Sequence, residues 1–296
     1  MIDTRLSFKQ HLAAVNNKAA AVMGALTKIL PNIGGPQGER RKLLSTVVDS
    51  IILYAAPVWA EAKNIHVREV VHTHRRSALW VSCAYRTVSD DAICAVAGKL
   101  PFDIHARELR RLYSEPGAKP TATEKAIERE RCMYVWQRRW EESLKRRWTY
   151  KLISHLGQWV KRKHGETDYY LTQILTGRGY FMEYLHRFQL AESPFYPSCP
   201  NAIESAEHVA FHCDRFARER AILERALGHS ASPNDIVQDM CSSSAKWVAV
   251  RAFAGKIMLR LQFIEWVRKT QQQKLQLQLR NGDELFPDRM MTNTDT

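Results

Sequence analysis

The residues best suited to chemistry are Cys199, His208 and Cys213, which fall within one fifteen-residue stretch. Eight residues separate Cys199 from His208, and four separate His208 from Cys213. Thiolate and imidazole groups are the ligands that tetrahedral zinc prefers, and a Cys-x2-Cys-x8-His-x4-Cys knuckle would supply four of them. The position of the first cysteine is taken by Tyr196, a poor zinc ligand. The segment is therefore predicted either to bind zinc weakly, with His212 or water as the fourth ligand, or to be a packed turn without metal.

A second chemical feature is a basic stretch. Residues 125–163 contain twelve Lys and Arg and four Glu, a net charge of +8 against +13 for the whole 296-residue chain. Lys and Arg neutralise phosphates and release counterions, so such a stretch is the usual electrostatic footprint of nucleic-acid binding. The alternative is a merely solvated helix face. The residues predicted to contact nucleic acid are Arg138, Arg139, Lys145, Arg146, Arg147, Lys161, Arg162 and Lys163.

Tryptophans are interleaved with these cations, at positions 136, 140, 148 and 159. Exposed aromatic rings stack on bases, which would suit single-stranded nucleic acid. Tyr134, Trp140, Leu144 and Trp148 also follow helical spacing, which is typical of a core-facing stripe. The sequence leaves both interpretations open.

Asp90 and Asp91 are adjacent carboxylates, the groups with which polymerases and nucleases hold divalent metal ions. They stand just before an Ala- and Val-rich segment, where Ser89 or Asp90 would cap a helix and an acid would face its positive end. We interpret the pair as a helix start. The chain contains no nucleophile elbow, phosphate loop or HExxH motif, so no catalytic residue is predicted.

The elements that position these residues are predicted to be helices. Glycine (13) and proline (11) are sparse, and apolar residues recur with a period of 3.6 rather than 2. The clearest predicted helices span residues 7–30, 37–54, 67–85, 90–98, 101–113, 216–227 and 244–274. Gly177 and Gly179 flank Arg178, which predicts a turn first and an anion-binding loop second. The predicted fold class is mainly α.

The chain divides by composition into four predicted regions. Residues 1–115 are helical and end at the linker sequence Glu-Pro-Gly-Ala-Lys-Pro. Residues 116–190 form the basic, Trp-rich helical region, and residues 191–228 form the Cys/His knuckle-like segment. Residues 229–296 form a long helix and a polar, frayed tail.

Composition limits the partners. A chain with this excess of positive charge favours polyanions, and no apolar run approaches the length of a membrane-spanning helix. Six cysteines are too few for a disulfide scaffold, so we expect reduced, intracellular thiols. We therefore predict a nucleic-acid partner and no membrane, and we identify no small-molecule substrate.

Several runs, taken in order, resemble the C-terminal part of the Pol protein of insect type-1 non-LTR retrotransposons. Tyr196 departs from that family, which has a cysteine at this position of its knuckle. Cys199, His208 and Cys213 match the other three ligands. The resemblance covers about residues 1–270, and its runs are Met1–His11, Ser50–Trp59, Ala84–Ala92, Leu175–Gly179, Ser205–Val209 and Phe211–Phe216.

The resemblance implies a reverse transcriptase polyprotein with an endonuclease, acting in the nucleus by target-primed insertion. Residues 1–115 would then be the thumb-like region after the polymerase palm, and the Mg²⁺-binding aspartates would belong to the full-length polymerase only. This chain would bind element RNA and target DNA. The alternatives are a non-catalytic helical nucleic-acid-binding or interaction protein derived from a truncated element, and an independent nuclease.

Overall fold

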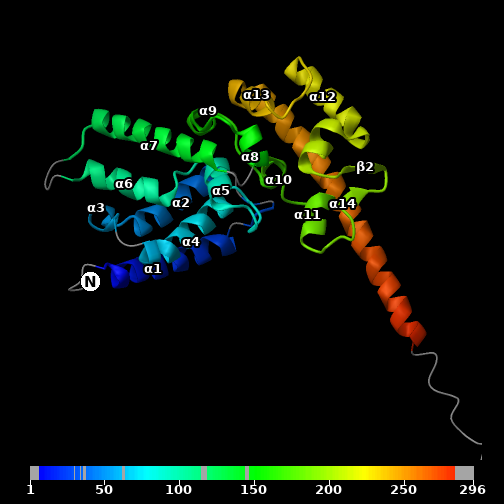
Figure 1. The fold of residues 1–296 in the computed structure, drawn as a ribbon, viewed down its shortest axis with the longest axis horizontal. Helices are drawn as coiled ribbons and strands as arrows, with labels where there is room; N and C mark the ends of the chain where they lie inside the picture. The colour runs from blue at the N-terminus through cyan, green and yellow to red at the C-terminus, as the bar shows by residue number, and fades with distance from the viewer. Residues whose placement is uncertain are drawn as a thin grey trace, which may run out of the picture.

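The computed structural model describes residues 7–29, 31–33, 35, 38–61, 64–114, 119–143 and 147–283. These residues are mainly helical, which confirms the predicted fold class (Figure 1). Among them, the only strands are the short β1 (Phe195–Tyr196) and β2 (Cys199–Ile203). The boundary predicted at residue 115 lies outside the described residues, and the division into four regions stays a prediction.

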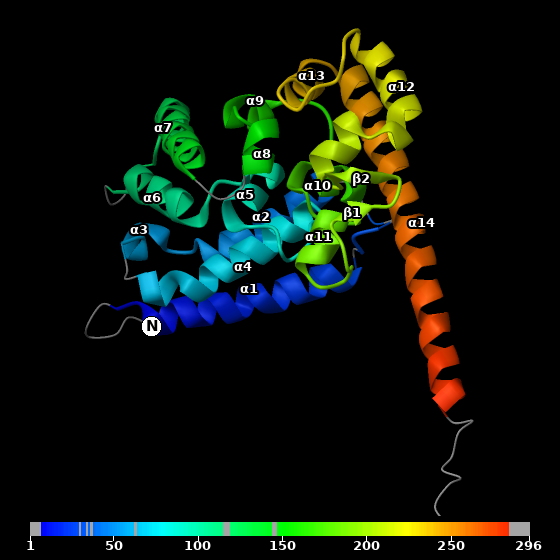
Figure 2. The same cartoon turned by 45° about the vertical axis from the view of Figure 1, so that its right-hand side comes forward.

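The first half of the chain is built on three mutually contacting helices, α1 (Lys9–Ile29), α2 (Gly38–Ile52) and α4 (Asn64–Val81). Their contact buries Leu12, Val48 and Val70 almost completely. Further helices extend this half of the molecule through pairwise contacts with their neighbours, as Figure 2 shows. They are α3 (Ala56–Trp59), α5 (Asp90–Ala97), α6 (Phe102–Leu112), α7 (Ala122–Glu142), α8 (Arg147–Leu152) and α9 (Leu156–Lys161).

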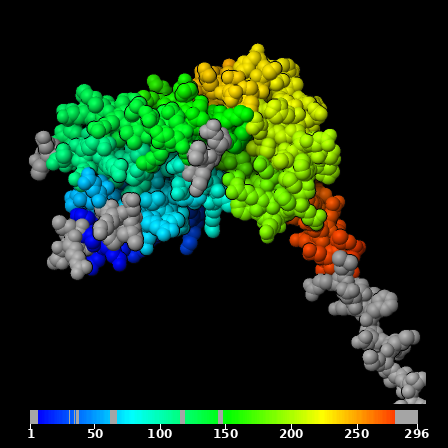
Figure 3. All heavy atoms as spheres, viewed as in Figure 1, coloured from blue at the N-terminus to red at the C-terminus, as the bar shows by residue number. Residues whose placement is uncertain are grey.

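The second half is organised along one long helix, α14 (Ser244–Asp283), which contacts α10, α12 and α13. The far end of α14 projects from the packed body, as Figure 3 shows. The remaining elements are α10 (Tyr169–Thr176), α11 (Met182–Arg187), the π-helical turn His208–His212, the 3₁₀ turn Asp214–Phe216, α12 (Ala217–Leu227) and α13 (Ile236–Ser242). Within the described part of the chain, no helix has the length and apolar character needed to cross a membrane.

Local chemistry explains where several helices end. The helix predicted over residues 67–85 ends at Val81, because Cys83 adopts a left-handed φ of 53°. At the end of α10, Gly177 has a φ of 62°, and its N–H donates to the carbonyl of Ile174. A left-handed residue at this position is the common helix terminator. The Gly177–Gly179 segment is thus a turn, as predicted.

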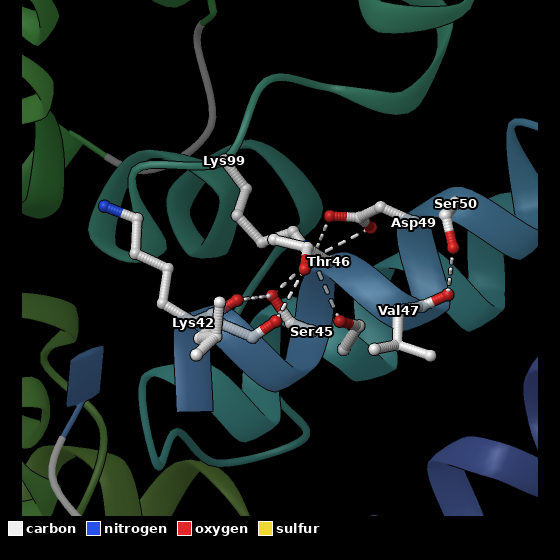
Figure 4. A network of polar contacts seen from close by, with 9 residues as sticks. Lys42, Ser45, Thr46, Val47, Asp49, Ser50 and Lys99 are labelled. Carbon is white, nitrogen blue, oxygen red and sulfur yellow. Dashed lines mark hydrogen bonds and ion pairs between the residues drawn. The ribbon is translucent and has the colours of Figure 1, made fainter. Parts of the chain in front are cut away.

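A buried polar network joins α2, α4 and the end of α5 (Figure 4). The Lys99 Nζ atom donates to Asp49 Oδ1 at 3.0 Å, to Ser77 Oγ at 2.9 Å and to Ser45 Oγ at 3.3 Å. Lys99 is only 7% exposed, so its charge depends on these three oxygens. Burial raises the pKa of Asp49, and the charge of Lys99 opposes that shift.

His105 on α6 makes this first half of the chain sensitive to acid. Its pKa falls to about 4, because burial and then the charges of Arg129 and Lys99 disfavour the imidazolium. An unfolded chain protonates His105 below about pH 6.5. The contribution of neutral His105 to the free energy of unfolding is therefore complete above that pH, and it is lost as the pH falls from about 6.5 to about 4.

We expect His105→Gln to remove about 2 kcal/mol of the stability difference between pH 7.5 and pH 5, by linkage. The measurement is chemical denaturation at both pH values, with the exposed His72→Gln as control. The raised pKa of the neighbouring Glu108 acts in the opposite direction and is present in all three proteins. Equal acid sensitivity in His105→Gln and wild type would contradict this assignment.

Candidate metal site and nucleic-acid interface

The Cys/His segment folds around a small hairpin. β1 and β2 pair antiparallel, and Tyr196 lies opposite Cys199 across the turn. The chain then enters the π-helical turn His208–His212. Cys213 follows this turn, and its N–H donates to the His208 carbonyl at 2.7 Å. One π-helical turn re-aims a side chain relative to an α-helix and is frequent at functional sites. The hairpin and the turn together bring the predicted ligands to one place.

The three ligand atoms of Cys199, His208 and Cys213 lie within 4.8 Å of one another. The two sulfurs are 3.6 Å apart. Among the described residues, this is the one group of three or more His, Cys, Asp or Glu side chains close enough to share a metal ion. The sequence spacing therefore predicted the convergence correctly.

The donor set fits a metal ion. The His208 Nε2 atom is buried and has no hydrogen-bond partner. Burial, and then the nearby charges of His212, Arg215 and Arg220, lowers the pKa of His208, which keeps the imidazole in the neutral form that a metal needs. Burial and a hydrogen bond with Cys213 raise the pKa of the Cys199 thiol. Metal binding would have to displace that proton.

Tyr196 and Arg215 occupy the space beside these ligands. The Arg215 guanidinium carbon lies 3.7 Å from the centre of the Tyr196 ring, and its Nε donates to the Cys213 Sγ atom at 3.3 Å. The same guanidinium forms an ion pair with the buried Glu204. This fixed positive charge next to Cys213 disfavours a second cation there. His212 is exposed and is not part of the three-residue group.

The predicted nucleic-acid contacts fall into three groups. Arg138, Lys161 and Lys163 are exposed at the surface of α7 and at the end of α9. Arg138 pairs with Glu142 at 3.2 Å, and Lys161 pairs with Glu130 at 2.7 Å. Such exposed pairs contribute about 0–1 kcal/mol, so a phosphate can replace the carboxylate. These three residues can meet a polyanion without disturbing the fold.

Arg139 and Arg162 have structural contacts instead. Arg139 forms two hydrogen bonds with Asp103 of α6, at 2.8 and 2.5 Å. The Arg162 guanidinium lies against the stacked rings of Trp159 and Trp247, at 4.0 and 4.8 Å from their centres. Lys145 and Arg146 lie outside the described residues, and the side chain of Arg147 is also outside them. That these five residues contact nucleic acid stays a prediction.

The interleaved tryptophans are mostly core residues. Trp136, Trp140 and Trp159 are at most 1% exposed, and Trp148 is half-buried, with its indole N–H donating to the Ile174 carbonyl. Of the two interpretations, core packing therefore holds for these rings. The exposed aromatic ring on α7 is Tyr134, at 64%.

Sequence reasoning missed Arg131, and the core-facing stripe that it suggested is wrong for Tyr134: both residues lie on the exposed face of α7 together with Arg138. The pKa of Arg138 is raised by hydrogen bonds with Glu142 and Tyr134. Intervals of three and four residues place the three side chains in one row along the helix. That spacing could have identified the row from the sequence. However, the nearby Trp residues left open which face of the helix is exposed.

Asp90 and Asp91 lie in the first turn of α5, as predicted, and Asp90 forms an ion pair with Arg75. The expected side-chain cap is wrong for Ser89, which is the N-cap by backbone conformation but makes no capping hydrogen bond. The favourable acid at the helix N-terminus is thus present without that cap.

Comparison with known proteins points to one group. A Retrovirus-related Pol polyprotein from type-1 retrotransposable element R1 4 of Nasonia vitripennis is 24% identical over 271 residues, which is 85% of this chain and 68% of that protein. The putative 115 kDa protein in type-1 retrotransposable element R1DM of Drosophila melanogaster is 25% identical over 280 residues, 88% of this chain and 27% of that protein.

A Pol polyprotein from element R1 of Popillia japonica is 34% identical over 94 residues, 31% of this chain and 36% of that protein. No family profile and no solved structure matches the chain. These relatives confirm the resemblance seen in the ordered sequence runs. Over most of its length, the chain is similar to the Pol polyproteins of insect type-1 retrotransposable elements.

Proposed function

We propose that this chain is the nucleic-acid-binding, C-terminal part of a retrotransposon Pol polyprotein. The observation that carries the proposal is the row of Arg131, Tyr134 and Arg138 on the exposed face of α7, next to the basic end of α9. The Lys161–Glu130 ion pair joins these two helices at the surface. A basic row with an exposed aromatic ring suits the backbone and the bases of a single strand.

The proposed ligands are element RNA and target DNA in the nucleus. In a longer protein of this family, reverse transcription with Mg²⁺ and the nicking of target DNA would be carried out by other segments. Nuclease and polymerase centres hold their metal ions with clustered carboxylates. The adjacent acids of this chain, Asp90 and Asp91, lie in the first turn of α5, with Asp90 paired to Arg75.

The Cys/His segment is proposed as a weak zinc site. Cys199, His208 and Cys213 would hold the ion, which would fasten the hairpin to the π-helical turn as a structural link. Three protein ligands leave one position open, and Arg215 adds an unfavourable charge. We therefore expect less than one zinc ion per chain in the wild-type protein.

Charge reversal tests the binding face. We expect Arg131→Glu/Arg138→Glu to weaken binding of a fluorescein-labelled single-stranded RNA about tenfold or more, and to reduce the salt slope by about 1.4, because two phosphate contacts to a single strand are lost. The matched control is Lys18→Glu/Lys28→Glu on α1, which lies on the side of the bundle away from α7 (Figure 2). Equal losses in both variants would mean that net charge alone is responsible, and would favour the helical interaction protein.

A further inference from the structure

The helix α14 carries apolar residues on two opposite faces. One face is buried against α10, α12 and α13 through Trp247, Ala254, Ile257 and Leu261. The other face is exposed: Val248 is 62% exposed, Leu259 52%, Phe263 62% and Trp266 61%. We refer to Val248, Ala252, Gly255, Leu259, Phe263 and Trp266 as the outer stripe. In the described part of the chain, no segment covers it.

The outer stripe has the geometry of a helix-packing seam. Its members follow one another at intervals of four, three, four, four and three residues, which keeps them on one side of an α-helix. Ala252 and Gly255 are small, and a Cβ atom added at Gly255 would meet no atom within 4 Å. A partner backbone can therefore approach closely there. Phe263 and Trp266 stack with ring centres 6.0 Å apart and form a large anchor further along.

Charges beside the outer stripe restrict the partner. By helical spacing, Lys256 and Lys274 lie along one side, and Arg251 and Lys269 lie along the other, where they pair with Asp168 and Glu265. The acid at position 265 of α14 is only 5% exposed and is paired with Arg268 and Lys269. A second copy of this face would bring the side with Lys256 and Lys274 against further cations, which is unfavourable.

We propose that the outer stripe docks an amphipathic helix of a partner protein whose apolar seam is bordered by Glu or Asp. The seam supplies apolar burial, and the flanking charges select the partner and its orientation, as the e and g positions do in a coiled coil. This face is separate from the α7 row, so it does not depend on the nucleic-acid proposal.

The test uses the full chain and two labelled synthetic helical peptides. Both carry Leu and Ile at the seam positions; one has Glu at the flanking positions and the other has Lys. Fluorescence anisotropy is expected to show binding of the Glu peptide, at least tenfold weaker binding of the Lys peptide, and at least tenfold weaker binding of the Glu peptide to Phe263→Gln/Trp266→Gln. Ile222→Gln on α12, where the side chain is 41% exposed, is the matched control and is expected to bind as wild type.

Equal binding of the two peptides, or binding of neither, overturns the proposal. Sedimentation of the chain alone tests whether a second copy of the chain covers the outer stripe. A wild-type dimer that becomes monomeric in Phe263→Gln/Trp266→Gln would overturn the proposal of a partner protein. Two further probes are phosphatidylserine vesicles and a single-stranded RNA oligonucleotide. The proposal is also overturned if Phe263→Gln/Trp266→Gln loses binding to the vesicles or to the RNA but still binds the Glu peptide as wild type does. Circular dichroism of each variant shows whether α14 is still folded.

Discussion

Replacing Tyr196 by cysteine is expected to convert a weak zinc site into a stoichiometric one. Tyr196 lies opposite Cys199 in the β1–β2 hairpin, with two residues between them, so the new thiol completes the Cys-x2-Cys arrangement. It also removes the ring on which Arg215 stacks. We expect zinc content to rise to about one per chain and affinity to rise about 100-fold or more, since loss of even an outer-shell partner costs 10- to 100-fold.

The measurement is zinc content by mass spectrometry and affinity by chelator competition. It is made under reducing conditions, because the Cys199 and Cys213 sulfurs are already 3.6 Å apart. Tyr196→Ser is the matched control, because it removes the ring without adding a thiolate. If Tyr196→Cys bound no more zinc than Tyr196→Ser, the three described ligands would not form a metal site.

Removing the carboxylate of Asp49 is expected to have the largest effect on stability. In Asp49→Ala the buried Lys99 keeps two hydroxyl partners, Ser45 and Ser77, but loses its carboxylate counter-ion. Breaking a buried ion pair from one side costs about 3–5 kcal/mol, because an uncompensated charge remains. That is a large part of the total stability of a typical protein.

The double variant Asp49→Leu/Lys99→Met is the informative control. Apolar residues of similar volume remove both charges, so we expect this protein to be more stable than Asp49→Ala. Denaturation monitored by far-UV circular dichroism measures both. A double variant as unstable as Asp49→Ala would show that the cost arises from packing around α2 and not from the charge left on Lys99.

Much of the helical architecture could be predicted from periodicity and from Gly and Pro. The predicted helices over residues 7–30, 37–54 and 90–98 match α1, α2 and α5 within three residues at each end. The β1–β2 hairpin could not be predicted, since its strands are too short to show an alternating pattern. The region 125–163 was expected to be helical, but its division into α7, α8 and α9 depends on tertiary packing.

The candidate metal site, too, could be predicted only in part from the sequence. Ligand spacing predicted that Cys199, His208 and Cys213 would meet, because short connections limit how far they can separate. The position of Arg215 over Tyr196 could not be predicted, since it depends on the buried Glu204 that holds the guanidinium. Charge counting also overestimated the free cations, because Arg139 pairs with Asp103 and Arg162 packs against two stacked indole rings.

The salt dependence of nucleic-acid affinity tests the central claim most directly. Filter binding of a single-stranded RNA to the full chain would be measured between about 50 and 200 mM salt. About five phosphate contacts predict an affinity loss of roughly 100-fold over this range, through counterion release. Affinity that stays unchanged over the same range, or no measurable binding at the lowest salt, would contradict the assignment of this chain as a nucleic-acid-binding part of a Pol polyprotein.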